Sequence, residues 1–110
     1  MKSFLAGCAL VALVTLPTGA VETWRNAPLM DKGCSAKKAD PETHPRACAL
    51  QCSASGYGII VEGKLLTFDA AGNGKALAAL RESKSTDHLR ATVTGERHGD
   101  TIAVESLTIE

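Results

Sequence analysis

Three cysteines and one histidine lying close together in the chain are the residues most suited to chemistry. They are Cys34, His44, Cys48 and Cys52. Four-residue spacing separates the last three, and it places side chains one above another on the same face of an α-helix. A helix through this segment would present an imidazole and two thiols in a column, with a third thiol nearby in sequence. Such a set indicates either a disulfide with one thiol left over or a soft-metal site.

The first interpretation is a metal site. Three cysteines and one histidine form a recognised ligand set for tetrahedral zinc. Soft thiolates also suit copper(I), and Met30 could add a thioether. Common zinc modules place closely spaced ligands at each end of the ligand set. In this sequence only the second half of the pattern, from His44 to Cys52, resembles such a group. On this hypothesis the cofactor is zinc or copper, and its ligands are Cys34, His44, Cys48 and Cys52.

The second interpretation is a structural disulfide from Cys34 to Cys48 or Cys52. A bond between Cys48 and Cys52 is disfavoured, because on a helix their Cβ vectors run parallel when they should face each other. Closing a loop of about 15 residues would stabilise the fold by roughly 3 kcal/mol in the chain-entropy model. A thiol-based redox role for Cys48 or Cys52 is a further alternative, since a position near a helix start lowers a thiol's pKa.

Residues 1–20 are typical of a secretory signal peptide. A lysine at position 2 precedes an apolar run from Phe4 to Leu16, and small residues before position 21 form a cleavage site. The run is too short to span a membrane, and nothing later in the chain is long enough. We therefore expect a bacterial protein of the periplasm or the medium, with one domain over residues 21–110. Cys8 leaves with the signal, and an odd cysteine count leaves at least one thiol outside an intramolecular disulfide.

The charge balance argues against a nucleic-acid partner. The chain has 12 basic and 12 acidic residues, and loss of the signal leaves one acidic residue in excess. Nucleic-acid binding needs a basic surface and, for single strands, aromatic stacking platforms. Only Trp24, Tyr57 and Phe68 remain as aromatic residues in the mature chain. We expect no nucleic acid and no membrane span after signal removal, and the sequence leaves a protein partner open.

Hydrophobic periodicity and turn residues set the order of elements. They predict strand, helix, two strands, helix, two strands. The expected segments are a short strand around 29–30, a surface loop over 31–42, a helix from 44 to 56, strands at 57–62 and 64–68, a turn cluster at 69–74, a helix at 75–82, and strands at 89–95 and 101–109. A change of phase near Glu105 and Ser106 indicates a β-bulge.

This order predicts a mainly β fold with two short helices. Five short strands with a helix before the final hairpin suit a small OB-like antiparallel barrel. An α+β sandwich with both helices on one face is the alternative. Asp31, Asp69 and Asp100 lie beside turns, where aspartate commonly bonds its own backbone, and they form no evident acid–base pair. We therefore expect a non-catalytic protein.

Four strings of residues resemble a group of small exported bacterial proteins that have an OB-like barrel and uncharacterised function. The strings are Leu29-Met30-Asp31-Lys32-x-Cys34, His44-x-Arg46-x-Cys48-Ala49-x-x-Cys52, Val93-Thr94-Gly95 and Gly99-Asp100-Thr101-Ile102-x-Val104. The resemblance covers most of the mature chain and implies the barrel fold and a pairing of Cys34 with the helix cysteines. It implies no reaction.

The functional prediction is an exported, non-catalytic small domain. Its Cys/His cluster either forms a structural disulfide or binds a soft metal, zinc or copper. The alternatives are a thiol-based redox protein and a plain barrel that binds a protein partner.

Overall fold

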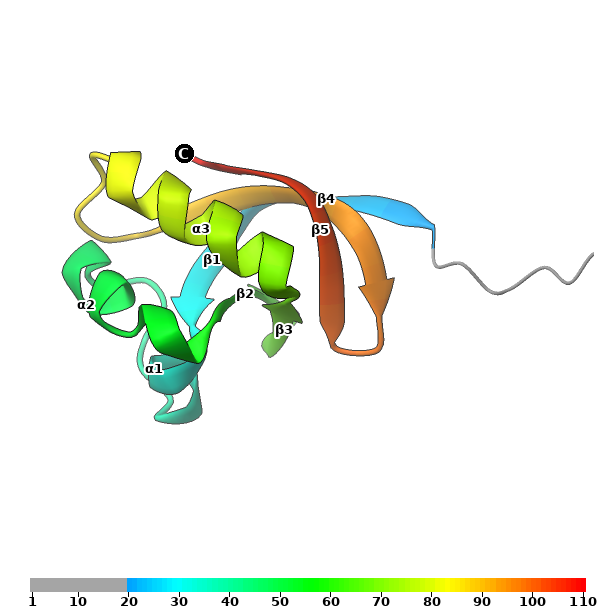
Figure 1. Ribbon diagram of the computed structural model, residues 1–110. Coiled ribbons are helices and arrows are strands. Elements are labelled where there is room, and N and C mark those ends of the chain that lie inside the picture. The colour runs from blue at the N-terminus through cyan, green and yellow to red at the C-terminus, as the bar shows by residue number, and fades with distance from the viewer. Residues whose placement is uncertain (1–19) are drawn as a thin grey trace, which may run out of the picture.

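Five strands form a closed barrel in the computed structural model, which describes residues 20–110 (Figure 1). The predicted signal peptide therefore lies, but for its last residue, outside the described residues. The strands are β1 (Val21–Asp31), β2 (Tyr57–Val61), β3 (Lys64–Phe68), β4 (Arg90–His98) and β5 (Thr101–Ile109). Around the barrel they follow the order β1-β2-β3-β5-β4. The predicted small OB-like barrel is confirmed.

Neighbouring strands are antiparallel except at one junction. There β3 and β5 pair in parallel, with Thr67 opposite Thr101 and Phe68 opposite Ile102. Strands β4 and β5 form a long hairpin in which Ala91 and Val93 face the core while Thr92 and Thr94 alternate with them. The register shifts between Thr94 and Gly95, which leaves Glu105 as the extra residue of β5. The predicted bulge is confirmed at this position.

The first strand is longer than its sequence indicates. We expected a short strand around Leu29, but β1 runs over 11 residues. Its polar first half, which shows no clean alternation, pairs with β4 from Val21 to Trp24. A hydroxyl–hydroxyl hydrogen bond of 3.0 Å between Thr23 and Thr94 joins the two strands. The partner strand, rather than hydrophobic burial, makes this segment extended.

Three α-helices and one turn of 3-10 helix accompany the barrel. They are α1 (Lys32–Ala36), α2 (Arg46–Gln51), η1 (Ser53–Ser55) and α3 (Ala70–Glu82). Two expectations are corrected here, because the predicted loop over 31–42 contains α1 and the predicted turn over 69–74 contains the start of α3. In both cases an aspartate side chain caps the helix, Asp31 for α1 and Asp69 for α3.

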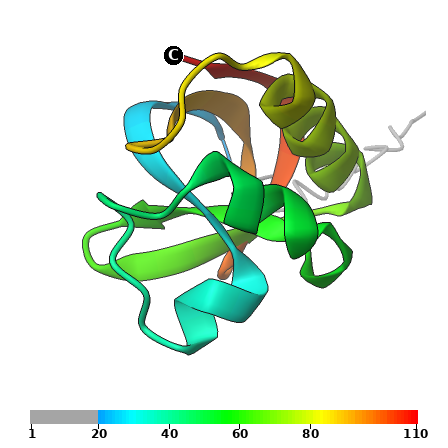
Figure 2. The same ribbon diagram turned by 90° about the vertical axis from the view of Figure 1, so that its left-hand side faces the viewer.

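The helices lie on different parts of the barrel. α3 packs along β5. α1 and α2 lie near the end of the barrel where β1 finishes, and there α1 contacts β1 while α2 contacts α3 (Figure 1). The same two helices occupy the near side in Figure 2. A hydrophobic core that includes Leu29, Ile59, Leu66, Leu80 and Ile102, all essentially inaccessible, fills the space between the strands and α3. No helix within residues 20–110 has the length and apolar character needed to cross a membrane.

Candidate metal centre

Asp31 joins the barrel to the first helix. It is the last residue of β1, lies opposite Tyr57 of β2, and is fully buried. Its backbone is extended, and its Oδ2 accepts a hydrogen bond of 2.8 Å from the backbone N–H of Cys34. This N-cap satisfies one of the free amide groups at the start of α1. The cap places the carboxylate beside the third residue of the helix, which is Cys34.

His44 approaches the same carboxylate from the other side. Its Nε2 lies 2.5 Å from Asp31 Oδ1, and the two side chains are 4% and 0% exposed. Contacts made by the residues two positions before and two positions after His44 hold this segment in place. Glu42 accepts two hydrogen bonds, of 2.5 and 2.6 Å, from the Arg90 guanidinium. The backbone N–H of Arg46 donates to the carbonyl of Thr86 at 2.8 Å.

Asp31, Cys34 and His44 together form a group of potential metal ligands. One donor atom from each lies within 4.8 Å of the donors of the other two. Tetrahedral zinc, with bonds of about 2.0–2.3 Å, needs donor separations of about 3.3–3.8 Å. The Asp31–His44 contact, at 2.5 Å, would open by about 1 Å to hold such an ion.

The electrostatics of the group set the protonation of its members. Burial raises the pKa of Asp31, but hydrogen bonds from the Cys34 backbone and the His44 side chain outweigh burial and lower it overall. The carboxylate is therefore charged at neutral pH and acts as the acceptor toward His44 Nε2. Burial, followed by contact with Asp31 and with the Cys52 thiol, raises the pKa of the Cys34 thiol to about 11. A metal ion would have to displace this thiol proton on binding.

The predicted column of three ligands on one helix face does not occur. α2 begins only at Arg46, so His44 precedes the helix and Cys52 is its C-terminal cap. Pro45 explains the difference, because a residue before proline is driven toward an extended backbone. Cys48 lies within α2 and is not a member of the group of three.

The structure places the remaining predicted ligands differently. Cys52 is also outside the group of three, but its side chain is near enough to Cys34 to raise the pKa of the Cys34 thiol. All three cysteines of the described chain are free thiols, so the predicted disulfide stays a prediction. Met30 directly precedes Asp31 in β1, and successive side chains of a strand point to opposite faces. Its thioether is therefore directed away from the carboxylate.

Asp31 is the member that the sequence pattern did not identify as a ligand. We had assigned it only to turn chemistry. A sequence signal did exist, because an aspartate that caps a helix contacts the residue three positions later. The spacing Asp31-x-x-Cys34, immediately after a buried strand, is such a signal. What sequence could not supply was the return of His44 to the same carboxylate.

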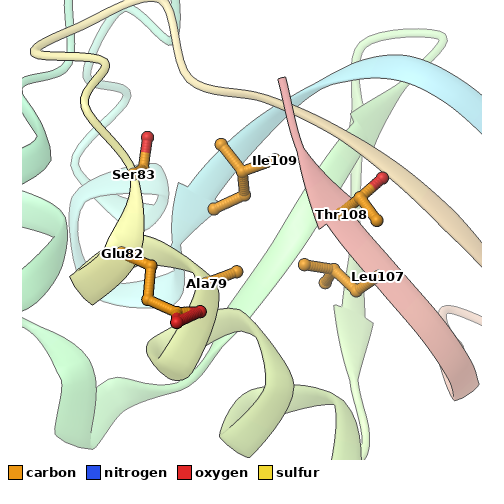
Figure 3. A pocket seen from close by; sticks show the side chains of 6 residues that line it. All are labelled: Ala79, Glu82, Ser83, Leu107, Thr108 and Ile109. Carbon is orange, nitrogen blue, oxygen red and sulfur yellow. The ribbon is translucent and has the colours of Figure 1, made fainter.

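A shallow hollow on the surface is a separate candidate for a functional site. It lies between the end of α3 and the end of β5, with a volume of about 290 Å³ (Figure 3). Ala79, Glu82, Ser83, Leu107, Thr108 and Ile109 line it. It shares no residue with the Asp31–Cys34–His44 group, and Glu82 is the one ionisable side chain in its lining. The buried group is therefore the stronger candidate for a functional site.

No protein-family model, curated protein or solved structure matches this chain.

Proposed function

We propose that this protein is an exported, non-catalytic barrel that binds one Zn²⁺ ion through Asp31, Cys34 and His44. The observation that carries the proposal is the convergence of a carboxylate, a thiol and an imidazole within 4.8 Å of one another. Two of the three side chains are almost completely buried. The lowered pKa of Asp31 keeps this carboxylate charged, as an oxygen ligand for a cation must be.

The mixture of donors favours zinc over the other candidate metals. Zinc accepts sulfur, nitrogen and oxygen ligands in a tetrahedron, whereas copper(I) prefers thiolates and thioethers. Met30, the thioether that copper would use, is directed to the opposite face of β1. Cys52 is the candidate for the fourth position, because its side chain is near enough to Cys34 to raise the pKa of that thiol. Cys34 is half-buried, which leaves the ion a route from solvent.

A purely thiol-based redox role has less support. The nucleophile in such chemistry is the thiolate. The raised pKa of Cys34 keeps this thiol protonated at neutral pH in the metal-free protein. Metal binding uses the same thiol without requiring it to be a free nucleophile, because the ion itself displaces the proton.

Two cysteine variants form the test. Reduced protein, kept in a phosphine reductant, is titrated with Zn²⁺ against a chromophoric chelator. We expect one Zn²⁺ per chain. The affinity of Cys34→Ser should be lower by more than about 100-fold, because the loss of a group that only supports a ligand already costs up to about 100-fold. Cys48→Ser removes a half-buried thiol outside the group and should bind as the wild type does.

Two results would contradict the proposal. The first is a reduced wild-type protein that takes up no Zn²⁺. The second is a Cys48→Ser variant that loses as much Zn²⁺ affinity as Cys34→Ser, since the two thiols would then contribute equally to metal binding.

A further inference from the structure

Three hydrogen bonds tie the start of α1 to the segment that follows α2. The backbone N–H of Lys32 donates to the carbonyl of Gly56 at 2.8 Å, and that of Gly33 donates to Ser55 Oγ at 3.1 Å. The Ser55 hydroxyl in turn donates to the carbonyl of Cys52 at 2.8 Å. These bonds hold the helix that carries Cys34 against the turn that carries Cys52. The two cysteines, 18 positions apart in sequence, thus become neighbours in space.

The three hydrogen bonds bring the two thiols near each other. In agreement with this placement, the Cys52 side chain is one of the groups that raise the pKa of Cys34. Both thiols are half-buried, so a small oxidant reaches them from solvent. Cys34 and Cys52 approach from two separate elements, which suits disulfide geometry better than two cysteines one turn apart on a helix.

We propose that Cys34 and Cys52 form a reversible disulfide, and that this disulfide and the bound metal ion exclude each other. The exclusion rests on the function proposed above, because both states need the same Cys34 Sγ. A sulfur within a disulfide bond is no longer available as the thiolate that zinc requires. The protein would therefore bind metal only when this cysteine pair is reduced.

The oxidant is a small-molecule disulfide. Cys52, as its thiolate, attacks a sulfur of the oxidant, forms a mixed disulfide and releases one small thiol. The second cysteine then attacks the protein sulfur of that mixed disulfide, which forms the Cys34–Cys52 bond and releases the other small thiol. Two electrons pass to the oxidant, and the two thiol protons leave with the two released thiols. A dithiol reductant reverses both steps.

The test uses the full exported chain with all three mature cysteines. Reduced protein is mixed with glutathione disulfide, with and without saturating Zn²⁺, and followed by intact mass and peptide mapping. We expect a loss of two hydrogens mapped to Cys34 and Cys52, slowed by Zn²⁺ at least tenfold. The oxidised protein should bind Zn²⁺ more than about 100-fold more weakly than the reduced protein.

Two variants control the test. Cys48→Ser should lose two hydrogens at the wild-type rate, with the same protection by Zn²⁺. Cys52→Ser should show no two-hydrogen loss, because the partner thiol is absent.

Three outcomes overturn the proposal. If no two-hydrogen loss occurs, or if it maps to Cys48, the disulfide is refuted while the metal site stands on its own titration. If a protein that binds Zn²⁺ is oxidised at the same rate with and without the ion, the exclusion is refuted. If the reduced protein binds no Zn²⁺, the proposed metal function and the exclusion both fail, and the mapping alone decides the disulfide.

Discussion

Two aspartates of this barrel perform the same local task in very different surroundings. Asp31 follows β1 and caps α1, whereas Asp69 follows β3 and caps α3. Each accepts a hydrogen bond of 2.8 Å from the backbone N–H three residues later. The remaining partner of Asp69 is another backbone amide, that of Val104 at 3.3 Å. The other oxygen of Asp31 faces an imidazole, with a thiol close by.

The comparison shows how a capping residue becomes a candidate ligand. All partners of Asp69 are backbone groups of the fold itself, so its carboxylate has only a structural task. Asp31 is fully buried, and besides its one capping amide its polar neighbours are titratable side chains. Buried carboxylates with specific charged or polar partners are typical of functional sites. The capping motif alone therefore does not identify a site, whereas the side chains that contact the capping carboxylate do.

The largest expected difference between the two aspartates is in stability. Asp31→Ala should cost about 2–4 kcal/mol in free energy of unfolding, because it removes an N-cap and also leaves the buried His44 imidazole without its hydrogen-bond partner. Asp69→Ala should cost only about 1–2 kcal/mol, as for the loss of an N-cap. Urea unfolding followed by circular dichroism measures both. Equal losses would show that His44 gains nothing from Asp31 beyond the cap.

Metal binding should separate the aspartates when both caps are kept. Asparagine caps a helix about as well as aspartate, so Asp31→Asn and Asp69→Asn should both fold. Only the first replaces a charged oxygen ligand by a weaker amide, and its Zn²⁺ affinity should fall by more than about 100-fold. Asp69→Asn should bind as the wild type does. Chelator competition on reduced protein measures both, and a comparable loss in the two variants would remove Asp31 from the site.

The two capped helices also differ in how tightly their first turns pack. A Cβ added at Gly72 of α3 would lie 2.5 Å from Val104 Cγ2, whereas one at Gly33 of α1 would meet nothing nearer than 3.5 Å. Gly72→Ala should therefore cost about 1–3 kcal/mol by overpacking. Gly33→Ala should be neutral or stabilise by up to about 1 kcal/mol, through the unfolded chain. Urea midpoints of the two variants test this, and an equally large cost at Gly33 would contradict the looser packing of α1.

Sequence patterns predicted the barrel well because its signals are local. Alternation along β4 and β5 reports which side chains face the core, and the phase change at Glu105 reports the bulge. The sequence patterns did not predict the first half of β1, because pairing with β4 makes it extended. They also did not predict the first turn of α3, because the Asp69 cap starts this helix. Sequence reasoning expects turns from glycines, whereas Gly72 lies within a helix at a position where a Cβ would collide with Val104.

The candidate site was only half predictable, for a different reason. Cys34 and His44 were identified from their residue types, and the structure brings both into one group. The assumed helical column failed because Pro45 delays the start of α2. The position of His44 depends on contacts such as that of Glu42 with Arg90, 48 positions away in sequence. No rule based on the spacing of residues in the sequence predicts a contact between residues so far apart.

The smallest expected effect concerns this distant contact. Glu42→Gln keeps the size of the side chain but removes the charge that pairs with Arg90, a pair that is 45% and 28% exposed at its two ends. A partly exposed ion pair contributes at most about 1 kcal/mol, and salt screens it. Zn²⁺ affinity should fall by less than about tenfold, because Glu42 touches no ligand directly.

A matched surface pair makes the Glu42 prediction specific. Lys64 and Asp100 form an ion pair of 2.9 Å in which both side chains are more than half exposed. Asp100→Asn should leave Zn²⁺ affinity unchanged at every salt concentration. The effect of Glu42→Gln should shrink as salt rises, because salt weakens the wild-type Glu42–Arg90 pair as well. If the two variants behave alike at low salt, the ion pair does not position His44, and the Arg46–Thr86 hydrogen bond would be the anchor that does.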